Sequence, residues 1–232
     1  MFKRAREIFH QHWKIILGLT ILSGMFSGSA QFDNLQDRPG LIISLTLGGW
    51  VITTLISNYL TRYVIAAAQD PEADFSRVVL NHLSWRQAWQ ILWKASVASL
   101  IVILPLTILV LIGLGLTILL ALSLDSGILF WLLAFIPFLV LTIGLVPFGG
   151  SIDYFIAQDE TMPLGDLIKR VWRFTTRYYW TLLKVTLIAG LQILVGILLL
   201  GIGLLYFAPV ANVYTTINWL ALDQAEQAWQ TH

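Results

Sequence analysis

Cysteine is absent from the 232 residues of the chain. This absence excludes disulfide bonds, thiol catalysis and metal sites that need cysteine ligands. Charged residues are also scarce: they make up 12% of the chain, about half of their share in an ordinary soluble domain. The net charge is +1 and no polybasic tract is present, so nothing in the sequence indicates nucleic acid as a partner.

Hydrophobic residues are abundant instead, at 57% of the chain, and they occur in long runs. Residues 95–124 and 127–152 contain no Asp, Glu, Lys or Arg. A helix needs about 20 apolar residues to cross the hydrocarbon core of a bilayer, and these runs exceed that length. The sequence therefore predicts one all-α, polytopic membrane domain. Membrane lipids, and itself or another membrane protein, are its candidate partners.

Six spans are predicted, and the short turns between them group them as three hairpins. Their approximate limits are 15–30, 41–68, 96–122, 128–157, 179–199 and 204–222. Thirteen of the 14 Lys and Arg residues lie on the side of both termini, and only Arg38 lies on the opposite side. Because basic loops stay in the cytoplasm, both termini are expected to face it.

The first 30 residues allow a second interpretation. A basic start, a short apolar core and the small residues Ser27 to Ala30 are also typical of a secretory signal peptide. We favour a retained helix, because Trp13 and Lys14 precede this run as Trp93 and Lys94 precede a later one.

Two amphipathic segments, Trp85–Lys94 and Pro163–Phe174, are predicted to be interfacial helices on the cytoplasmic face. Ser84 and Gln87 fit a capping box, so the first should begin near Trp85. A tryptophan stripe can also bind a sugar or a quaternary amine, but anchoring in the interface is the commoner role. The expected interfacial anchors are Trp13, Lys14, Trp85, Trp89, Trp93, Lys94, Trp172, Trp180 and Lys184.

Three acids at alternate positions, Asp70, Glu72 and Asp74, suggest either a divalent metal site or helix capping. We favour capping, because no further ligands cluster near them. The four histidines lie in flanks or tails, and no motif of a hydrolase, metalloprotease or phosphate-binding loop is present. An enzyme is therefore not expected, and neither is a cofactor or a metal.

Polar residues inside the apolar runs are the candidate functional cluster, because such groups normally face the interior of a bundle or a cavity. They are Arg62, Asp153, Asn218, Asn58, Gln192 and Asn212, with Tyr214 beside them. Asp153, Arg62 and Asn218 fall at the same depth in the three hairpins, so Asp153 is expected to pair with Arg62 or to meet cytoplasmic water. A proton or substrate site at Asp153 is the alternative.

Parts of the last third of the chain resemble a superfamily of bacterial six-span membrane proteins. It includes YciC-like proteins and the membrane domain of some glycerophosphodiester phosphodiesterases. The resemblance is carried by Tyr154–Asp159, Pro163-Leu164, Lys169–Phe174, Tyr178–Trp180, Gly201–Leu205 and Pro209. It implies six spans in a bacterial inner membrane. No phosphodiesterase domain follows in this sequence, so that activity is not expected.

Two classes of function remain open. A non-catalytic membrane module, acting as a scaffold, lipid-interacting element or envelope factor, fits the small loops and the absence of a soluble domain. A small-solute or ion transporter fits the prolines, glycines and buried polar residues, and the three similar hairpins loosely fit transporter repeats. Those hairpins align at Lys14, Lys94 and Lys184, through true repetition or convergence. A polar cavity lined by Asp153, Asn212 and Gln192 would favour transport.

Overall fold

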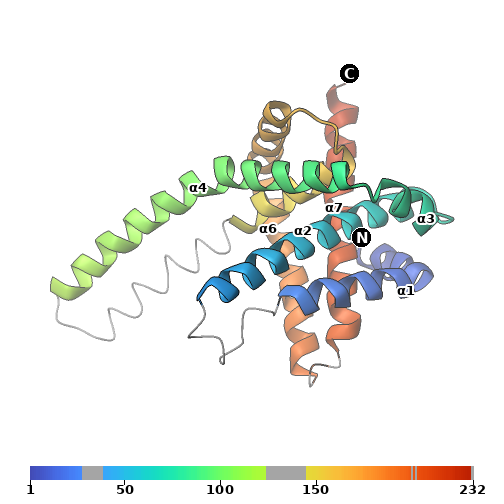
Figure 1. Cartoon of the computed structure of the whole chain (residues 1–232), viewed down its shortest axis with the longest axis horizontal. Coiled ribbons are helices and arrows are strands. Elements are labelled where there is room, and N and C mark those ends of the chain that lie inside the picture. The colour runs from blue at the N-terminus through green and yellow to red at the C-terminus, as the bar shows by residue number, and fades with distance from the viewer. Residues whose placement is uncertain (28–38, 124–144, 200, 202, 231–232) are drawn as a thin grey trace.

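The computed structural model describes residues 1–27, 39–123, 145–199, 201 and 203–230 of the chain. Within these ranges helices are the only regular elements, which confirms the all-α prediction (Figure 1). They are α1 (Phe2–Ser27), α2 (Pro39–Gln69), α3 (Phe75–Val78), the 3-10 helix η2 (Leu80–His82), α4 (Trp85–Ser123), α6 (Leu164–Leu198) and α7 (Leu204–Gln230). A further helical segment, 145–158, precedes α6 and is called the central helix below.

The described parts of all six predicted spans are helical. Residues 128–144 of predicted span four lie outside the described residues, as do the predicted connections at 31–38 and 124–127. The two amphipathic segments are helical, and each is continuous with the apolar segment that follows it. Trp85–Lys94 opens the 39-residue helix α4, and residues 164–174 open the 35-residue helix α6. No proline or glycine separates the amphipathic part from the apolar part at either place, so the helix continues. Their interfacial placement stays a prediction.

Local capping sets where the helices in the second polar connection begin. Asp74 accepts a hydrogen bond from the backbone N–H of Ser76 and caps α3, which is the favoured role for this acid. The Ser84 hydroxyl accepts from the backbone N–H of Gln87 at 3.3 Å, and α4 begins at Trp85 as predicted. Both caps satisfy N–H groups that a helix start leaves without partners.

The helices fan out from one end and do not form a parallel bundle (Figure 1). α1 packs antiparallel to α2, and α6 packs antiparallel to α7. In Figure 1 the α6–α7 hairpin runs down the view, whereas α1, α2 and α4 run across it, and the far part of α4 points away from the other helices. Two of the three predicted hairpins are thus present, and the third lies partly outside the described residues, so a six-span bundle is not confirmed.

The central helix is the core of the molecule. Ser151, Phe155 and Ile156 are at most 1% exposed, and Tyr154 is 2% exposed. The Phe155 ring meets the Phe174 ring of α6 edge to face, with centroids 5.2 Å apart. Most of this helix is buried because other helices enclose it, although Val146 at its start is 43% exposed and Asp153 is partly exposed.

The N-terminal part of α1 differs from the expected basic flank. Residues 2–11 form an amphipathic helix that buries Ala5, Ile8 and Phe9, and a non-helical residue, His12, bends α1 after it. Arg6 donates from Nε to the hydroxyl of Tyr206 at 3.0 Å. The charge count predicts that residues 1–14 and the α6–α7 turn lie on opposite sides of the membrane. The contact between Arg6 and Tyr206 departs from that predicted topology.

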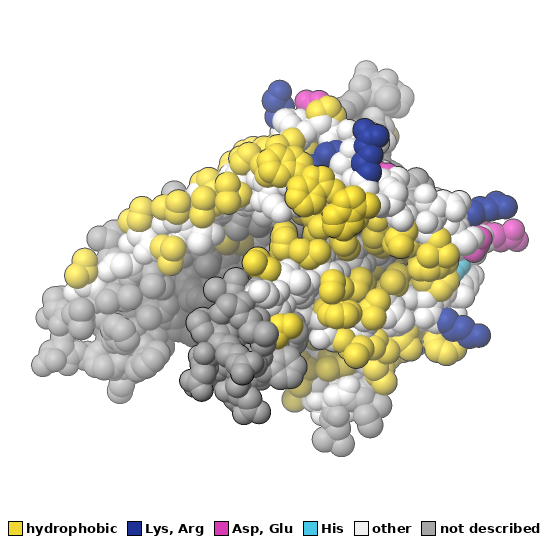
Figure 2. Space-filling view, in the orientation of Figure 1, with side chains coloured by type: hydrophobic (Ala, Val, Ile, Leu, Met, Phe, Trp, Pro, Cys, Tyr) yellow, Lys and Arg dark blue, Asp and Glu magenta, His cyan; other side chains and the backbone are white. Residues whose placement is uncertain are grey.

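Large apolar side chains cover much of the outer surface (Figure 2). Figure 2 shows them along α4 and on the face below it, while the charged side chains in view gather at the top and right edges. Among the described residues one helix, α6, is long and apolar enough to cross a membrane. One such helix is weak support for a membrane protein, but only 28% of its apolar window is buried, whereas the core helix of a soluble protein is mostly buried.

The turn between α6 and α7 depends on glycine, and it is as short as predicted. Gly201 has a φ of 77°, in the left-handed region that other residues enter at a cost. A side chain on Gly203 would lie 2.9 Å from Cα of Gly196, so these two glycines let the helix ends touch.

Replacing Gly203 by Ala is expected to lower the free energy of unfolding by about 1–3 kcal/mol, because the new methyl group would overlap the backbone of Gly196. Gly190→Ala in α6 is the control, since nothing lies within 4 Å of an added Cβ there. Thermal unfolding in detergent measures both. Equal stability of the two variants would contradict the close approach of the helix ends.

Candidate functional site

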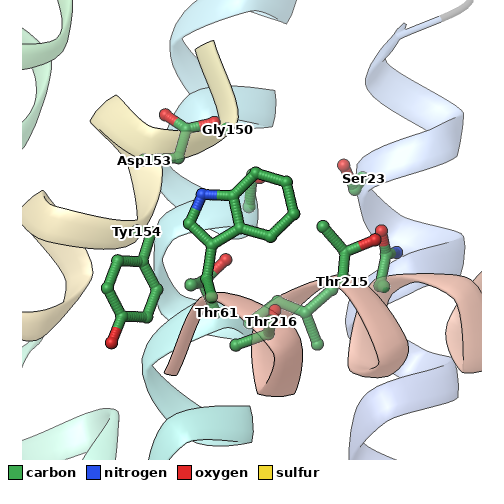
Figure 3. A pocket seen from close by; sticks show the side chains of 11 residues that line it. Ser23, Thr61, Gly150, Asp153, Tyr154, Thr215 and Thr216 are labelled. Carbon is green, nitrogen blue, oxygen red and sulfur yellow. The ribbon is translucent and has the colours of Figure 1, made fainter. Parts of the chain in front are cut away.

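A polar cavity of about 220 Å³ lies between α1, α2, the central helix and α7 (Figure 3). Figure 3 shows Asp153 and Tyr154 on one side of it and Ser23 and Thr215 on the other. The lining residues are Ser23, Ser57, Leu60, Thr61, Gly150, Asp153, Tyr154, Asn212, Thr215, Thr216 and Trp219. Four helices thus contribute mainly small and hydroxyl-bearing side chains at one level, and the space between them stays open.

Trp219 forms one wall of this cavity and is held in a fixed position. Its Nε1 donates to the hydroxyl of Ser151 at 3.2 Å. Its ring packs over Gly150, where an added Cβ would lie 3.3 Å from the ring carbon Cζ2. The indole fills the space that a side chain at position 150 would need, so glycine at this position allows α7 to approach the central helix.

Among the residues that the structure describes, Asp153 is the only carboxylate that lines the cavity. Its side chain is partly exposed there, and among the described residues it forms no hydrogen bond or ion pair. The Nδ2 of the buried Asn58 donates to the backbone carbonyl of Asp153 at 3.4 Å and so fixes this turn of the central helix against α2. The carboxylate itself is left without a counter-charge in the part of the chain that the structure describes.

Several hydroxyl groups of the cavity also lack internal partners. Thr215 donates to the carbonyl of Ala211 at 2.9 Å, which is the usual bond of a threonine to its own helix. Within the described ranges the hydroxyls of Ser57, Thr61 and Thr216 form no hydrogen bond. Because a hydroxyl can donate and accept, these three groups are available to a molecule or ion in the cavity.

The polar residues that the sequence singled out are only partly brought together. Asp153 and Asn212 line the cavity, with Asn58 behind Asp153. Asn218 instead donates to the carbonyl of Tyr214 in its own helix at 2.7 Å. Gln192 is not among the residues that line the cavity, and its Oε1 is buried without a partner among the described residues. Of the three residues whose shared cavity would favour transport, Asp153 and Asn212 line this cavity and Gln192 does not.

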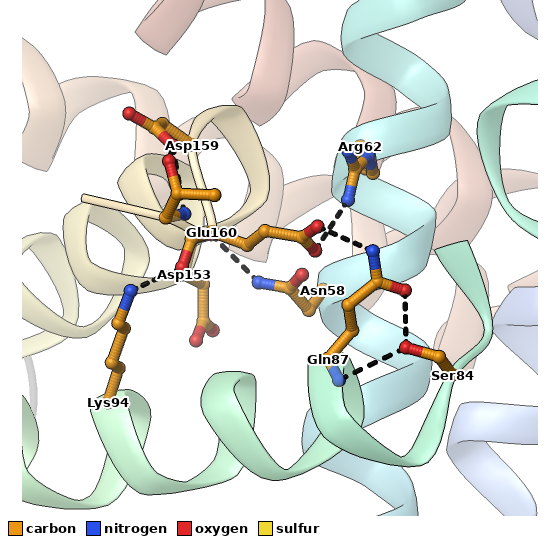
Figure 4. A network of polar contacts seen from close by, with 9 residues as sticks. Asn58, Arg62, Ser84, Gln87, Lys94, Asp153, Asp159 and Glu160 are labelled. Carbon is orange, nitrogen blue, oxygen red and sulfur yellow. Dashed lines mark hydrogen bonds and ion pairs between the residues drawn. The ribbon is translucent and has the colours of Figure 1, made fainter. Parts of the chain in front are cut away.

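The predicted ion pair between Arg62 and Asp153 is not formed. Arg62 is bound by Glu160 instead, with 2.9 Å between Nη1 and Oε2. Figure 4 shows the carboxylate of Asp153 pointing away from both Arg62 and Glu160. Glu160 lies just beyond the end of the central helix, where its side chain reaches Arg62, whereas Asp153 lies almost two turns earlier and faces the cavity.

Glu160 joins three elements at this end of the molecule (Figure 4). Its Oε2 accepts from Arg62 of α2, and its Oε1 accepts from Nε2 of Gln87 in α4 at 2.9 Å. Its backbone carbonyl accepts from Nζ of Lys94, also in α4. The Glu160 side chain is 9% exposed, so these contacts satisfy a carboxylate that would be costly to bury alone.

A second buried carboxylate, Asp223 of α7, lies nearby in the fold. It accepts from Nη2 of Arg170 at 2.9 and 3.2 Å and from the amides of Gln158 and Gln227 at 2.9 Å each. The hydroxyl of Tyr154 adds a longer bond of 3.4 Å. The central helix, α6 and α7 therefore meet at one carboxylate. Together, Arg62, Gln87, Lys94, Glu160, Arg170, Asp223 and Glu226 are called the polar rim below.

Two charged groups beside the rim have shifted pKa values. Partial burial lowers the pKa of Lys94, while the nearby charges of Asp159 and Glu160 oppose this shift. Asp159 has its pKa lowered chiefly by a hydrogen bond from the hydroxyl of Thr161, with the backbone N–H of Thr161 adding to it. Both groups contact the turn between the central helix and α6: Asp159 lies in it, and Lys94 donates to the backbone carbonyl of Glu160.

Sequence reasoning missed Glu160, Asp223 and Glu226. One pattern could have indicated the last two. Arg170, Arg173 and Arg177 lie three and four residues apart on one face of α6, and Asp223 and Glu226 lie three apart on the antiparallel α7. Glu226 indeed lies 3.7 Å from Arg173 and 3.8 Å from Arg177. No comparable pattern selects Glu160 over its neighbours.

The expected interfacial anchors lie mostly on the outer surface. The exposed fractions of Trp13, Trp85, Trp89, Trp93, Trp172 and Trp180 lie between 47% and 82%. Lys14 and Lys184 are exposed as well. Lys94 differs, because it is partly buried and donates to Glu160, which makes it a member of the polar rim.

The arrangement offers binding groups and no assembled catalytic set in the described part of the chain. There, no three His, Asp or Glu side chains are close enough to hold a metal ion. The carboxylates of Glu160 and Asp223 are already bound by cations and amides, whereas the carboxylate of Asp153 faces a cavity. The chemistry at hand is the binding of a small polar or charged species.

Comparison with known proteins adds no relative: no protein-family model, curated protein or solved structure matches the chain. The resemblance to six-span bacterial membrane proteins therefore stays a prediction from the residues that carry it.

Breaking the contact between Arg62 and Glu160 is expected to destabilise the fold. Arg62→Gln and Glu160→Gln should each lower the free energy of unfolding by about 2–4 kcal/mol, because each strands the other charge in a site where Arg62 is only 19% exposed. The double variant should lose less than the sum of the two, as measured in a double-mutant cycle by thermal unfolding.

Glu72→Gln is the matched control, because Glu72 is exposed and its side chain forms no hydrogen bond or ion pair with a described residue. It should change stability by less than about 0.5 kcal/mol. Additive losses for Arg62 and Glu160 would show that the pair does not couple the central helix to α2.

Proposed function

We propose that this chain is an integral membrane protein with six spans, and that it acts as a non-catalytic module of a bacterial inner membrane. In this role it contacts lipid, serves as a scaffold or envelope-associated element, and has itself or another membrane protein as its protein partner. The observation that carries the proposal is the apolar outer surface of α4 and α6, which ends at the polar rim.

The second half of α6 supports this placement most directly. Leu187, Leu191, Leu194 and Leu198 are between 45% and 73% exposed. A soluble monomer rarely exposes a continuous apolar surface of this kind, whereas lipid covers it without cost. The first half of the same helix carries Lys and Arg, so the helix passes from a charged end to an apolar end.

The charged groups support the same boundary. In the described residues the buried ion pairs of Glu160 and Asp223 join the end of α2, the start of α6 and the end of α7. A layer of charge at one end and apolar side chains beyond it is the pattern of a helix bundle that enters the bilayer from one side. The positive-inside rule then favours a cytoplasmic rim.

Solute or ion transport is a second candidate, and the cavity at Asp153 is the observation that favours it. Polar residues near the middle of membrane helices are costly unless they line a water-filled space or bind a substrate. The cavity contains Asp153 and Asn212 but not Gln192. We rank transport second because the cavity reaches only two of the three residues expected along a pathway.

Accessibility labelling tests the membrane proposal without background, because the native chain has no cysteine. Leu191→Cys and Trp89→Cys replace side chains that are 60% and 61% exposed. In intact membranes a water-soluble maleimide should label both far more slowly than in denaturant, because lipid shields them. Arg86→Cys and Arg173→Cys, on the charged faces, should be labelled in both conditions.

Val171→Cys cannot serve in this experiment, because Val171 is fully buried within the protein and would be protected with or without lipid. Labelling of Leu191→Cys at the rate of Arg86→Cys in intact membranes would contradict the proposal. The apolar surface of α6 would then be open to water and not covered by lipid.

Reporter fusions test the six-span topology separately. Fusions after residues 35 and 125 are expected to read outside, and a fusion at the C-terminus is expected to read inside, because 13 of 14 basic residues lie on the other side of these two loops. A cytoplasmic location of either loop would contradict the six-span topology. The fusion after residue 35 is the more informative one, because the contact between Arg6 and Tyr206 departs from the topology predicted for the N-terminal segment.

A further inference from the structure

We propose that the cavity at Asp153 is a binding site for one small monovalent cation, either an alkali-metal ion or a small primary ammonium ion. This inference goes beyond the membrane module. It rests on the cavity alone, so it can hold or fail independently of the membrane placement.

The charge of the site selects a cation. In the described part of the chain, Asp153 is the only carboxylate that lines the cavity, and no Lys, Arg or His lines it. The neighbouring positive charges are occupied elsewhere: Arg62 binds Glu160, and Arg170 binds Asp223. Lys94 donates to the backbone of Glu160. A partly buried carboxylate without a counter-charge is costly, and a bound cation removes that cost.

The other lining groups suit the same ligand. The hydroxyls of Ser57, Thr61 and Thr216 have lone pairs that no described residue uses. Hydroxyl and carboxylate oxygens are the ligands that hard cations prefer. The aromatic rings of Tyr154 and Trp219 form part of the wall and add a favourable surface for positive charge. An anion could accept from the hydroxyls, but the charge of the Asp153 carboxylate would repel it.

Size and charge number narrow the ligand further. Pockets for drug-sized molecules measure about 300–1,000 Å³, so a cavity of about 220 Å³ suits an ion with a few waters or a compact amine. Divalent ions are usually held by six or more oxygens that include several carboxylates. One carboxylate balances one positive charge, which favours a monovalent species.

The test uses the purified full-length chain in detergent and measures its thermal unfolding in chloride salts at constant ionic strength. The probes are sodium, potassium and methylammonium, each titrated against N-methylglucamine, a far bulkier secondary ammonium ion. At least one probe should raise the unfolding temperature along a saturating curve, because a ligand that binds only the folded state stabilises it. Comparing the metal ions with methylammonium shows whether the site prefers an alkali-metal ion or a primary ammonium ion.

Two sets of variants locate the effect. Asp153→Asn should abolish the saturating shift, whereas Asp166→Asn, which removes an exposed acid from the first turn of α6, should keep it. Thr61→Val and Ser57→Ala should fold normally and weaken the apparent affinity by roughly tenfold each, because contacts to a charged group are lost. Isothermal titration calorimetry of the same variants gives an independent measure of affinity.

Two results would overturn the proposal. The first is an unfolding temperature that follows ionic strength alone, with no difference between the probes and N-methylglucamine. The second is a shift of equal size in Asp153→Asn and in the native chain, which would place the bound cation elsewhere. If Asp153→Asn fails to fold, the Thr61→Val and Ser57→Ala affinities decide, and unchanged values for both count against the site.

Discussion

The contact of Glu160 with Arg62 fixes the end of the central helix, and the positions of the other helices follow from it. One carboxylate binds α2 through Arg62 and α4 through Gln87, while its backbone carbonyl takes Lys94. The central helix cannot turn about its axis without breaking all three contacts. Because its orientation is fixed, Asp153 faces the cavity and Tyr154 faces Asp223. The same contact neutralises Arg62, so among the described residues Asp153 is the one unbalanced charge at the cavity.

The features that the sequence predicted well are local ones. The start of α4 at Trp85 follows from the side chain of Ser84, three residues from its partner Gln87. The turn after α6 follows from Gly201, and the helices follow from apolar runs that no breaker interrupts. Each of these depends on residues that are neighbours in the chain, so the sequence contains the whole cause.

The partner of Arg62 could not be predicted in the same way. Asp153, Asp159 and Glu160 lie within eight residues of one another, and all three are acids near the predicted end of a span. Only the packing of the central helix, 98 residues away from Arg62, decides which of them it meets. Only part of the cavity lining could be predicted, for a related reason. Asp153 and Asn212 are unusual in apolar runs, but serines and threonines there are common and often bond to their own helix, as Thr20 and Ser96 do.

The long separation between Arg62 and Glu160 also has a consequence for synthesis. Ribosomes add about 5–20 residues per second, so Arg62 is made roughly 5–20 s before the carboxylate that neutralises it. Arg170 precedes Asp223 by 53 residues and waits about half as long. During this interval Arg62 cannot yet meet the Glu160 carboxylate. The ion pair of Arg170 with Asp223 needs α7, the last helix to be made, so it can form only when synthesis is nearly complete.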